Sequence, residues 1–143
     1  EVGAGAAEGS TVNIPMPAGA GDGHYLAAFR DIVVPAALRF APDLVVVSAG
    51  FDAHRDDPLA MVELTTQAFA AMAEAAVAVA DQCARGRLLC LLEGGYDLRA
   101  LSDSVAAVLE VLEQPRGPAA LDQGELPPSA RESLRIHSSY WNS

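Results

Sequence analysis

Two short runs of apolar residues stop abruptly at polar, glycine-containing segments. The first run, Val45–Val47, leads into residues 48–54, and the second, Leu88–Leu92, leads into residues 93–97. Short, continuously apolar runs of this kind are typical of strands that are buried on both faces of a parallel sheet. We therefore predict strands at residues 44–50 and 87–92, each ending where the polar side chains begin.

Three further segments carry apolar residues at the spacing of a helix that buries one face. The first covers residues 25–40, where Pro35 is expected to kink the helix or split it in two, because proline lacks a backbone N–H. The second covers residues 64–83, and the third covers residues 98–112 with Asp97 as its N-cap. Strands that alternate with helices form right-handed, parallel βαβ units. The pattern thus predicts an α/β fold with a mostly parallel sheet.

The outer segments of the chain differ from this regular alternation. Residues 11–17 predict a short strand with prolines near its end. Residues 115–128 are rich in proline, glycine and polar side chains, which is typical of a linker, and residues 131–141 predict a short terminal helix or arm that packs back on the domain. We place a domain portion at residues 1–113 and a linker with a C-terminal tail at residues 114–143.

The composition indicates a globular and acidic protein. Hydrophobic residues make up 51% of the chain, and 9 lysines and arginines stand against 19 aspartates and glutamates, a net charge of −10. Such a surface disfavours direct nucleic-acid binding but tolerates basic protein tails or polyamines. Cys83 and Cys90 have neither a metal-ligand spacing nor a disulfide framework, and no apolar stretch is long enough to span a bilayer. We expect a cytoplasmic protein without direct contact to nucleic acid or membrane.

Polar residues after the two predicted strands are candidates for a functional site. In an open α/β sheet, ligands bind beyond the carboxyl ends of the strands. If the two strands are neighbours, Asp52 and Tyr96 project from the same edge. Gly94 and Gly95 lack a Cβ, so both can take a positive φ and let a ligand approach the backbone. Taken alone, Asp52 is more often a turn residue than a metal ligand, and Tyr96 can equally be a core aromatic.

The remaining histidines and acids near these segments have simpler interpretations. His54 is expected at the edge of a pocket or behind it, whereas His24 and His137 are expected on the solvated surface. Asp56 and Asp57 are expected to order their loop through hydrogen bonds with the backbone, as short acidic side chains often do.

Together, these segments resemble the histone deacetylase family, which includes bacterial histone deacetylase-like amidohydrolases and acetylpolyamine amidohydrolases. The resemblance runs from about Thr11 to about Leu112, and the aspartate motif followed by Glu-Gly-Gly-Tyr is its most specific part. Phe51 and Glu93 are more similar to the class II and bacterial branches than to class I. The matching residues are 12–17, 19–22 with Tyr25, 48–54, 57–59 and 92–96.

The resemblance implies a three-layer αβα, arginase/deacetylase-like fold with a mostly parallel sheet, present here as the C-terminal portion of a catalytic domain. It also implies zinc-dependent hydrolysis of an acetylamide. Asp52 would be one of three protein ligands to Zn²⁺, and Tyr96 would hydrogen-bond the acetyl carbonyl and its oxyanion. Leu59, Gly94 and Gly95 would line the substrate pocket. The family's other two zinc ligands, in an Asp-x-His motif, and its two proton-transfer histidines would lie upstream of this chain.

The substrate class stays open at this point. Leu59 at the pocket rim favours an acetyllysine-type substrate, because an acid there would favour a cationic polyamine. The alternatives are an acetylpolyamine amidohydrolase and a non-catalytic, deacetylase-like module that binds acyl-lysine or other proteins. The expected partners are acetylated proteins or small acetylated amines, an oligomer is possible, and the chain alone is expected to be inactive.

Overall fold

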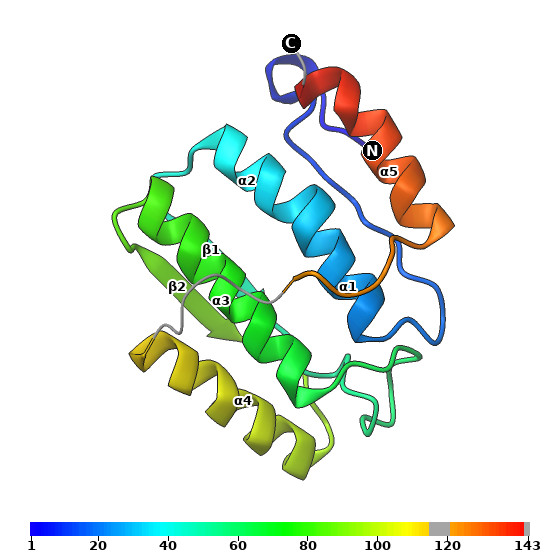
Figure 1. Ribbon diagram of the computed structural model, residues 1–143, viewed down its shortest axis with the longest axis vertical. Coiled ribbons are helices and arrows are strands. Elements are labelled where there is room, and N and C mark those ends of the chain that lie inside the picture. Colours follow the sequence, from blue (N-terminus) through cyan, green and yellow to red (C-terminus); the bar gives the residue numbers. More distant parts are fainter. Residues whose placement is uncertain (115–120, 142–143) are drawn as a thin grey trace.

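A parallel pair of strands organises the chain in the computed structural model, which describes residues 1–114 and 121–141. The strands β1 (Val45–Ala49) and β2 (Leu88–Leu92) pair in register along their whole length. The helix α3 (Thr66–Cys83) connects them, so the three elements form one βαβ unit (Figure 1). Both predicted strands and the predicted crossover helix are therefore confirmed, within a residue or two at their ends.

The predicted helix over residues 25–40 is continuous but changes its geometry at the expected place. It starts as α1 (Asp22–Ala28), widens into a π-helical segment at Phe29–Val33, and continues as α2 (Val34–Phe40). Pro35 lies in the first turn of α2, directly after the π-helical segment. Proline has no N–H to complete the regular ladder, and a π-helical turn is one way for a helix to absorb that loss. The helix is not split at Pro35, and the π-helical segment before it is the change of geometry that the structure shows.

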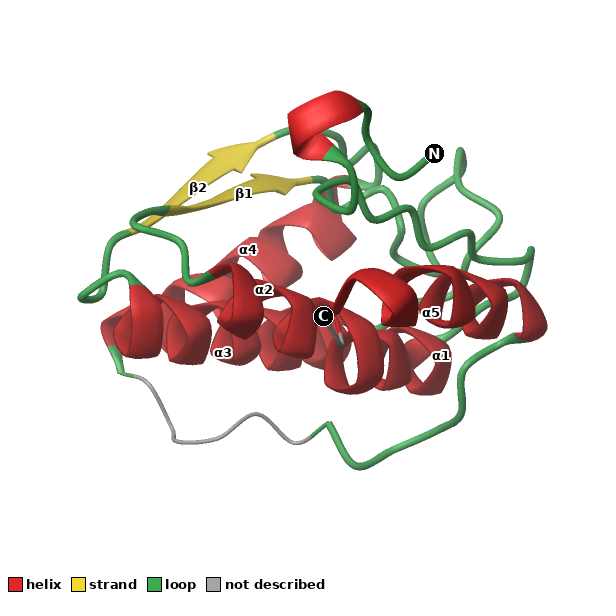
Figure 2. Ribbon diagram, turned by 90° about the horizontal axis from the view of Figure 1, so that it is seen from above, coloured by secondary structure: helices red, strands yellow, loops and turns green. Residues whose placement is uncertain are grey.

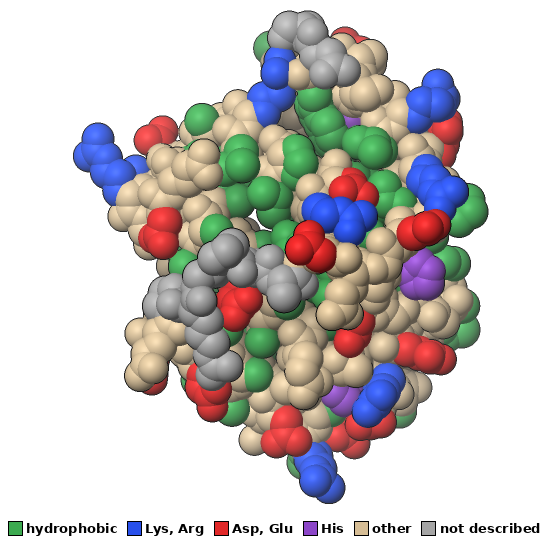
Figure 3. Space-filling view, viewed as in Figure 1, with side chains coloured by type: hydrophobic (Ala, Val, Ile, Leu, Met, Phe, Trp, Pro, Cys, Tyr) green, Lys and Arg blue, Asp and Glu red, His purple; other side chains and the backbone are tan. Residues whose placement is uncertain are grey.

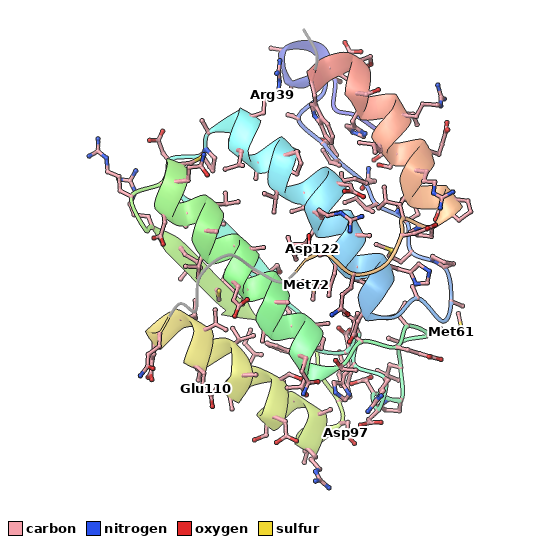
Figure 4. All side chains as sticks on the ribbon, viewed as in Figure 1. Arg39, Met61, Met72, Asp97, Glu110 and Asp122 are labelled. Carbon is pink, nitrogen blue, oxygen red and sulfur yellow. The ribbon has the colours of Figure 1, made fainter. Side chains whose placement is uncertain are left out.

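The helices α3 and α4 (Leu98–Glu113) form a layer beneath the sheet (Figure 2). The predicted N-cap of α4 is confirmed, because the Asp97 carboxylate accepts a hydrogen bond of 2.8 Å from the Ala100 N–H. Figure 4 shows Asp97 at this end of the helix. The core between the strand ends and the helices contains the buried residues Phe51, Leu64, Ala68 and Phe69.

The described helices cover only one face of the sheet (Figure 2). On the opposite face, Val46, Leu89 and Leu91 keep 53%, 48% and 48% of their surface exposed. The prediction that both faces of the strands are buried is therefore wrong for residues 1–114 and 121–141. In the described residues, no element packs on the apolar side chains of that face. On the covered face, Cys90 is a partly buried free thiol, and burial raises its pKa.

Residues 11–17 are extended but form no strand, which corrects the prediction. The helix α5 (Pro128–Trp141) lies beside them where a strand would have a neighbouring strand. Polar side chains of α5 lie within hydrogen-bond distance of every second backbone carbonyl of the extended segment. Four helical residues rise about 6 Å and two extended residues about 6.6 Å, so the two repeats nearly match. The contacts are Ser129 Oγ donating to Pro15 O at 2.7 Å, Ser133 Oγ donating to Asn13 O, and His137 Nε2 at 2.7 Å from Thr11 O.

The position of His137 also differs from the prediction. Its side chain is buried between α5 and the extended segment, not on the solvated surface, and only 2% of the residue is exposed. Nδ1 lies 2.9 Å from Ser133 O, and the ring packs against Trp141 with 5.5 Å between the ring centroids. His24, predicted on the same surface, is half-buried. The packing of residues 131–141 on the domain was predicted, but the burial of His137 was not, because its partners are the backbone carbonyls of Ser133 and Thr11.

Replacing His137 with leucine is expected to destabilise the protein. The His137→Leu change keeps apolar bulk but removes both ring nitrogens, so the Thr11 carbonyl loses its partner. We expect the free energy of unfolding to fall by about 1 kcal/mol, as for one lost hydrogen bond. Urea unfolding measures the difference, with Ser139→Ala on the exposed side of α5 as the control. Equal stability of His137→Leu and the control would contradict the packing role.

The surface is acidic without an extended basic patch on the face that Figure 3 shows. Basic side chains lie apart from one another there, and acidic side chains are interspersed with them. Within residues 1–114 and 121–141, no helix is both long enough and apolar enough to cross a membrane.

Candidate functional site

The loops that follow β1 and β2 meet at one edge of the sheet, as predicted. Hydrogen bonding continues past the strand ends, where the Phe51 N–H donates to Gly94 O at 2.7 Å. Asp52 comes directly after this bond, and Tyr96 lies two residues beyond it on the other loop. The two candidate side chains therefore start from adjacent backbone segments.

The carboxylate of Asp52 packs against two glycines. A Cβ on Gly94 would lie 2.7 Å from the Asp52 Oδ2, and a Cβ on Gly50 would lie 3.0 Å from its Oδ1. Contacts this short leave no room for a side chain at Gly94. Gly95 has a φ of +145°, whereas Gly94 does not adopt a positive φ, so the prediction of positive φ is correct for Gly95 and wrong for Gly94. At Gly94, glycine makes space for the aspartate.

Tyr25 is a further polar side chain near this edge. Burial raises the pKa of its phenol, and the negative charge of Asp52 raises it further. The hydroxyl therefore remains a hydrogen-bond donor at neutral pH. Tyr25 also lines a cavity of about 230 Å³ beneath β1 and β2, together with Phe51 and Met72. Figure 4 labels Met72 on α3. Sequence reasoning assigned Tyr25 no role, because a tyrosine in a helical stripe looks like an ordinary core residue.

Asp57 joins the two loops of the site. Its Oδ1 accepts from the Leu59 N–H at 3.0 Å, and its Oδ2 accepts from Tyr96 N–H at 2.7 Å and Asp97 N–H at 3.3 Å. Burial alone would raise the pKa of this carboxyl, but the three backbone hydrogen bonds and the nearby His54 outweigh it and hold the pKa below its usual value. The prediction that Asp57 orders its loop is confirmed, and the link to Tyr96 was not foreseen.

Near Asp57 in the same loop, Asp56 is exposed and His54 is buried. The Asp56 carboxylate is 65% exposed and lies 3.6 Å from His54 Nδ1. His54 itself is buried, its Nδ1 accepts from the Asp56 N–H at 3.2 Å, and its Nε2 lies 3.4 Å from the Thr66 hydroxyl. These contacts fix the loop from behind and leave His54 facing a polar hollow at the start of α3.

The outer part of the site is apolar and open. Leu59, Met61 and Leu98 are 66%, 77% and 81% exposed, and Tyr96 is 57% exposed. Figure 4 shows Met61 at the outer margin of its loop. Because Asp57 ties the backbones of Leu59 and Tyr96 to one carboxylate, both side chains start near the same point.

The described residues do not hold a complete metal site. No group of three or more histidine, cysteine, aspartate or glutamate side chains in residues 1–114 and 121–141 is arranged to bind a metal ion. Asp52 fits the role of a single ligand, because its carboxylate is a suitable donor for Zn²⁺ and lies at the strand end. The roles of Asp52 in metal binding, Tyr96 in catalysis, and Leu59, Gly94 and Gly95 in the pocket stay predictions.

Comparison with known proteins agrees with this geometry. The family model described as "Histone deacetylase domain" matches residues 1–112. The chain belongs to the histone deacetylase family. It is 48% identical to Histone deacetylase 10, chloroplastic, of Oryza sativa subsp. japonica over 106 residues. The matched region covers 74% of this chain and 24% of that protein. It is 34% identical to a probable deacetylase of Archaeoglobus fulgidus, over 99% of this chain and 44% of that protein.

A solved structure extends the similarity to the fold. The crystal structure of the HDA15 HD domain superimposes with a TM-score of 0.81 at 36% identity, over 99% of this chain and 38% of that chain. The arginase/deacetylase-like fold class is thereby confirmed, with the parallel sheet and one helical layer present in the described residues. This chain spans less than half the length of each of these three relatives.

Proposed function

We propose that this chain forms the C-terminal part of a zinc-dependent deacetylase centre that hydrolyses acetylamides. The observation that carries the proposal is the meeting of Asp52 and the Tyr96 segment at one sheet edge, joined by the Phe51–Gly94 hydrogen bond of 2.7 Å. In this proposal, an N-terminal portion of the catalytic domain supplies the other two zinc ligands and the proton-transfer histidines. We call a polypeptide that contains both portions the complete domain.

Each residue of this chain has a distinct part in the proposed reaction. Bound Zn²⁺ would supply a Lewis acid for the acetyl carbonyl and lower the pKa of water. Asp52 would hold the metal ion through its carboxylate, which Gly94 and Gly50 leave in a defined position. Tyr96 would donate a hydrogen bond to the oxyanion that develops on the acetyl carbonyl, where a fixed donor has its largest effect. The products are acetate and a free amine.

The proposed substrate class is acetyllysine in proteins or peptides. Leu59, Met61 and Leu98 give the site an exposed apolar rim, which supports contact with the aliphatic stem of lysine. The acidic composition, with a net charge of −10, is compatible with basic protein tails. An acetylated polyamine is the alternative substrate, and the same charge would tolerate it.

Assays on the complete domain and on this chain alone test the proposal. The complete domain should deacetylate a fluorogenic acetyllysine peptide in a chelator-sensitive manner, and faster than it deacetylates an acetylated polyamine. This chain alone should bind zinc weakly and show no measurable turnover, because it supplies one of three ligands. Chelator-sensitive turnover by the chain alone would contradict the proposed division of the site. A complete domain that binds acetyllysine without hydrolysing it would instead indicate a non-catalytic binding module.

Gly94→Ala should impair metal binding in the complete domain. The new Cβ would meet the Asp52 Oδ2 at 2.7 Å and push the carboxylate away from its position. We expect the zinc affinity to fall by about tenfold or more, as for disturbed support of a metal ligand. Zinc titration with a competing chelator measures it. The control is Gly21→Ala, whose Cβ would come no nearer than 3.4 Å to the Glu63 carbonyl oxygen. Equal zinc affinities in the two variants would contradict the packing argument.

A further inference from the structure

Asp57 is a buried acid to which the proposed reaction gives no part. Only 7% of the residue is exposed, yet its carboxylate carries three hydrogen bonds from backbone N–H groups. Burying a carboxylate is unfavourable unless such donors compensate it. An apolar side chain at this place would leave these backbone N–H groups without their acceptor, so the carboxylate has a structural part in joining them.

The two oxygens of Asp57 serve different loops. Oδ1 accepts from the Leu59 N–H at 3.0 Å, within the loop that follows β1. Oδ2 accepts from the Tyr96 N–H at 2.7 Å, across to the loop that follows β2. The Asp97 N–H adds a longer bond of 3.3 Å to Oδ2, just where Asp97 caps α4. One side chain thus fixes the distance between the Asp52 loop and the Tyr96 backbone.

The Tyr96 side chain is only partly held by packing. Its side chain is 57% exposed, so packing constrains the ring only in part. The residue before it, Gly95, has a φ of +145°, in a region open to glycine and few other residues. A backbone with this freedom needs an anchor if the phenol is to occupy one position. The bond from the Tyr96 N–H to Asp57 is that anchor.

We propose that Asp57 is a positioning residue, whose carboxylate anchors the Tyr96 backbone and thereby aims the Tyr96 hydroxyl at the reacting carbonyl. This inference rests on the proposed function, in which Tyr96 donates to the oxyanion. Asp57 touches neither substrate nor metal in this scheme and acts through Tyr96 alone. Its contribution therefore appears in the rate of the chemical step and not in zinc binding.

Asp57→Asn is the sharpest change, because it keeps the size of the side chain. Both oxygens of the aspartate face backbone N–H donors, so either orientation of an amide turns its NH₂ group toward a donor. One of the two loops must then move. A misplacement of about 1 Å at a reacting group lowers the rate by about a hundredfold.

The experiment compares the complete domain with its Asp57→Asn and Asp56→Asn variants. For Asp57→Asn, we expect kcat to fall by about tenfold to a hundredfold, with KM and zinc content nearly unchanged. Asp57→Glu keeps a carboxylate and should recover part of the lost kcat. Asp56→Asn changes the neighbouring, 65% exposed carboxylate and should keep the original kcat. Loss of zinc from Asp57→Asn, or an unchanged kcat, would overturn the inference.

A double-mutant cycle with Tyr96→Phe separates positioning from general destabilisation. If Asp57 acts through the Tyr96 hydroxyl, Asp57→Asn should have little further effect on kcat once that hydroxyl is absent. Two losses that multiply would show that Asp57 acts independently of Tyr96, and would overturn the inference while leaving the proposed function intact. A Tyr96→Phe variant with unchanged kcat would overturn the proposed role of Tyr96, and the inference with it.

Discussion

Tyr96→Phe should lower the kcat of the complete domain by about a hundredfold or more, as expected for the loss of one oxyanion donor. The change keeps the aromatic ring and the Gly94–Gly95 turn and removes only the hydroxyl. Because the hydroxyl acts mainly on the transition state, substrate affinity and zinc content should change little. Steady-state kinetics on an acetyllysine peptide, with elemental analysis of the same preparations, measure all three quantities.

The matched control for this variant is Tyr140→Phe on α5. It also removes a phenol hydroxyl, but one that donates to Glu8 at 3.0 Å and lies outside the candidate site. Its kcat should equal that of the unchanged protein. An unchanged kcat in Tyr96→Phe would reduce Tyr96 to a structural aromatic, and loss of zinc or stability would mean that the hydroxyl serves the fold.

Asp52→Ala should abolish both zinc binding and turnover in the complete domain. The carboxylate contributes charge as well as geometry, and two remaining ligands would hold the metal ion much more weakly. Gly94 and Gly50, which leave room for the carboxylate, would border an unfilled space in the variant. Elemental analysis and the deacetylation assay check the two losses together.

The controls for Asp52 are the two acids that follow it in the same loop. Asp56→Ala and Asp57→Ala should both retain zinc, because neither carboxylate is assigned to the metal ion. Asp57→Ala should still be slow, since it releases the Tyr96 backbone. Zinc lost from Asp57→Ala but kept in Asp52→Ala would show that the wrong acid was assigned.

The elements of this chain that depend on local sequence were predictable. Short apolar runs mark β1 and β2, helical periodicity marks α3 and α4, and Asp97 caps α4 as expected. The interruption at Pro35 follows from the chemistry of proline alone. These features need no knowledge of distant partners, because each follows from the side chains of one short segment.

Features that depend on distant partners were not predictable from the pattern. Residues 11–17 look like a strand, but α5 satisfies their carbonyls through Ser129, Ser133 and His137. The apolar run of β1 suggests burial on both sides, yet Val46 is 53% exposed in the described part of the chain. In both cases the local signal is correct about what the segment can do. The partner that decides the outcome lies elsewhere in the sequence.

The candidate site shows the same division. That Asp52 and Tyr96 lie at one edge follows from two neighbouring parallel strands, so their proximity was predictable. The bond of 2.7 Å from the Tyr96 N–H to Asp57 was not, because it joins residues 39 positions apart through a backbone donor. The effect of Asp52 on the Tyr25 phenol was hidden for the same reason. Spacing along the chain carries no signal for such contacts.

Anomalous diffraction at the zinc edge from crystals of the complete domain would test the central claim most directly. The account predicts a single strong peak at the sheet edge, about 2.0–2.2 Å from a carboxylate oxygen of Asp52, with the other protein ligands contributed by the N-terminal portion. It also predicts the Tyr96 hydroxyl on the substrate side of that peak. A peak beside Asp57 or His54, or no peak within reach of Asp52, would contradict the assignment of this edge as the metal centre.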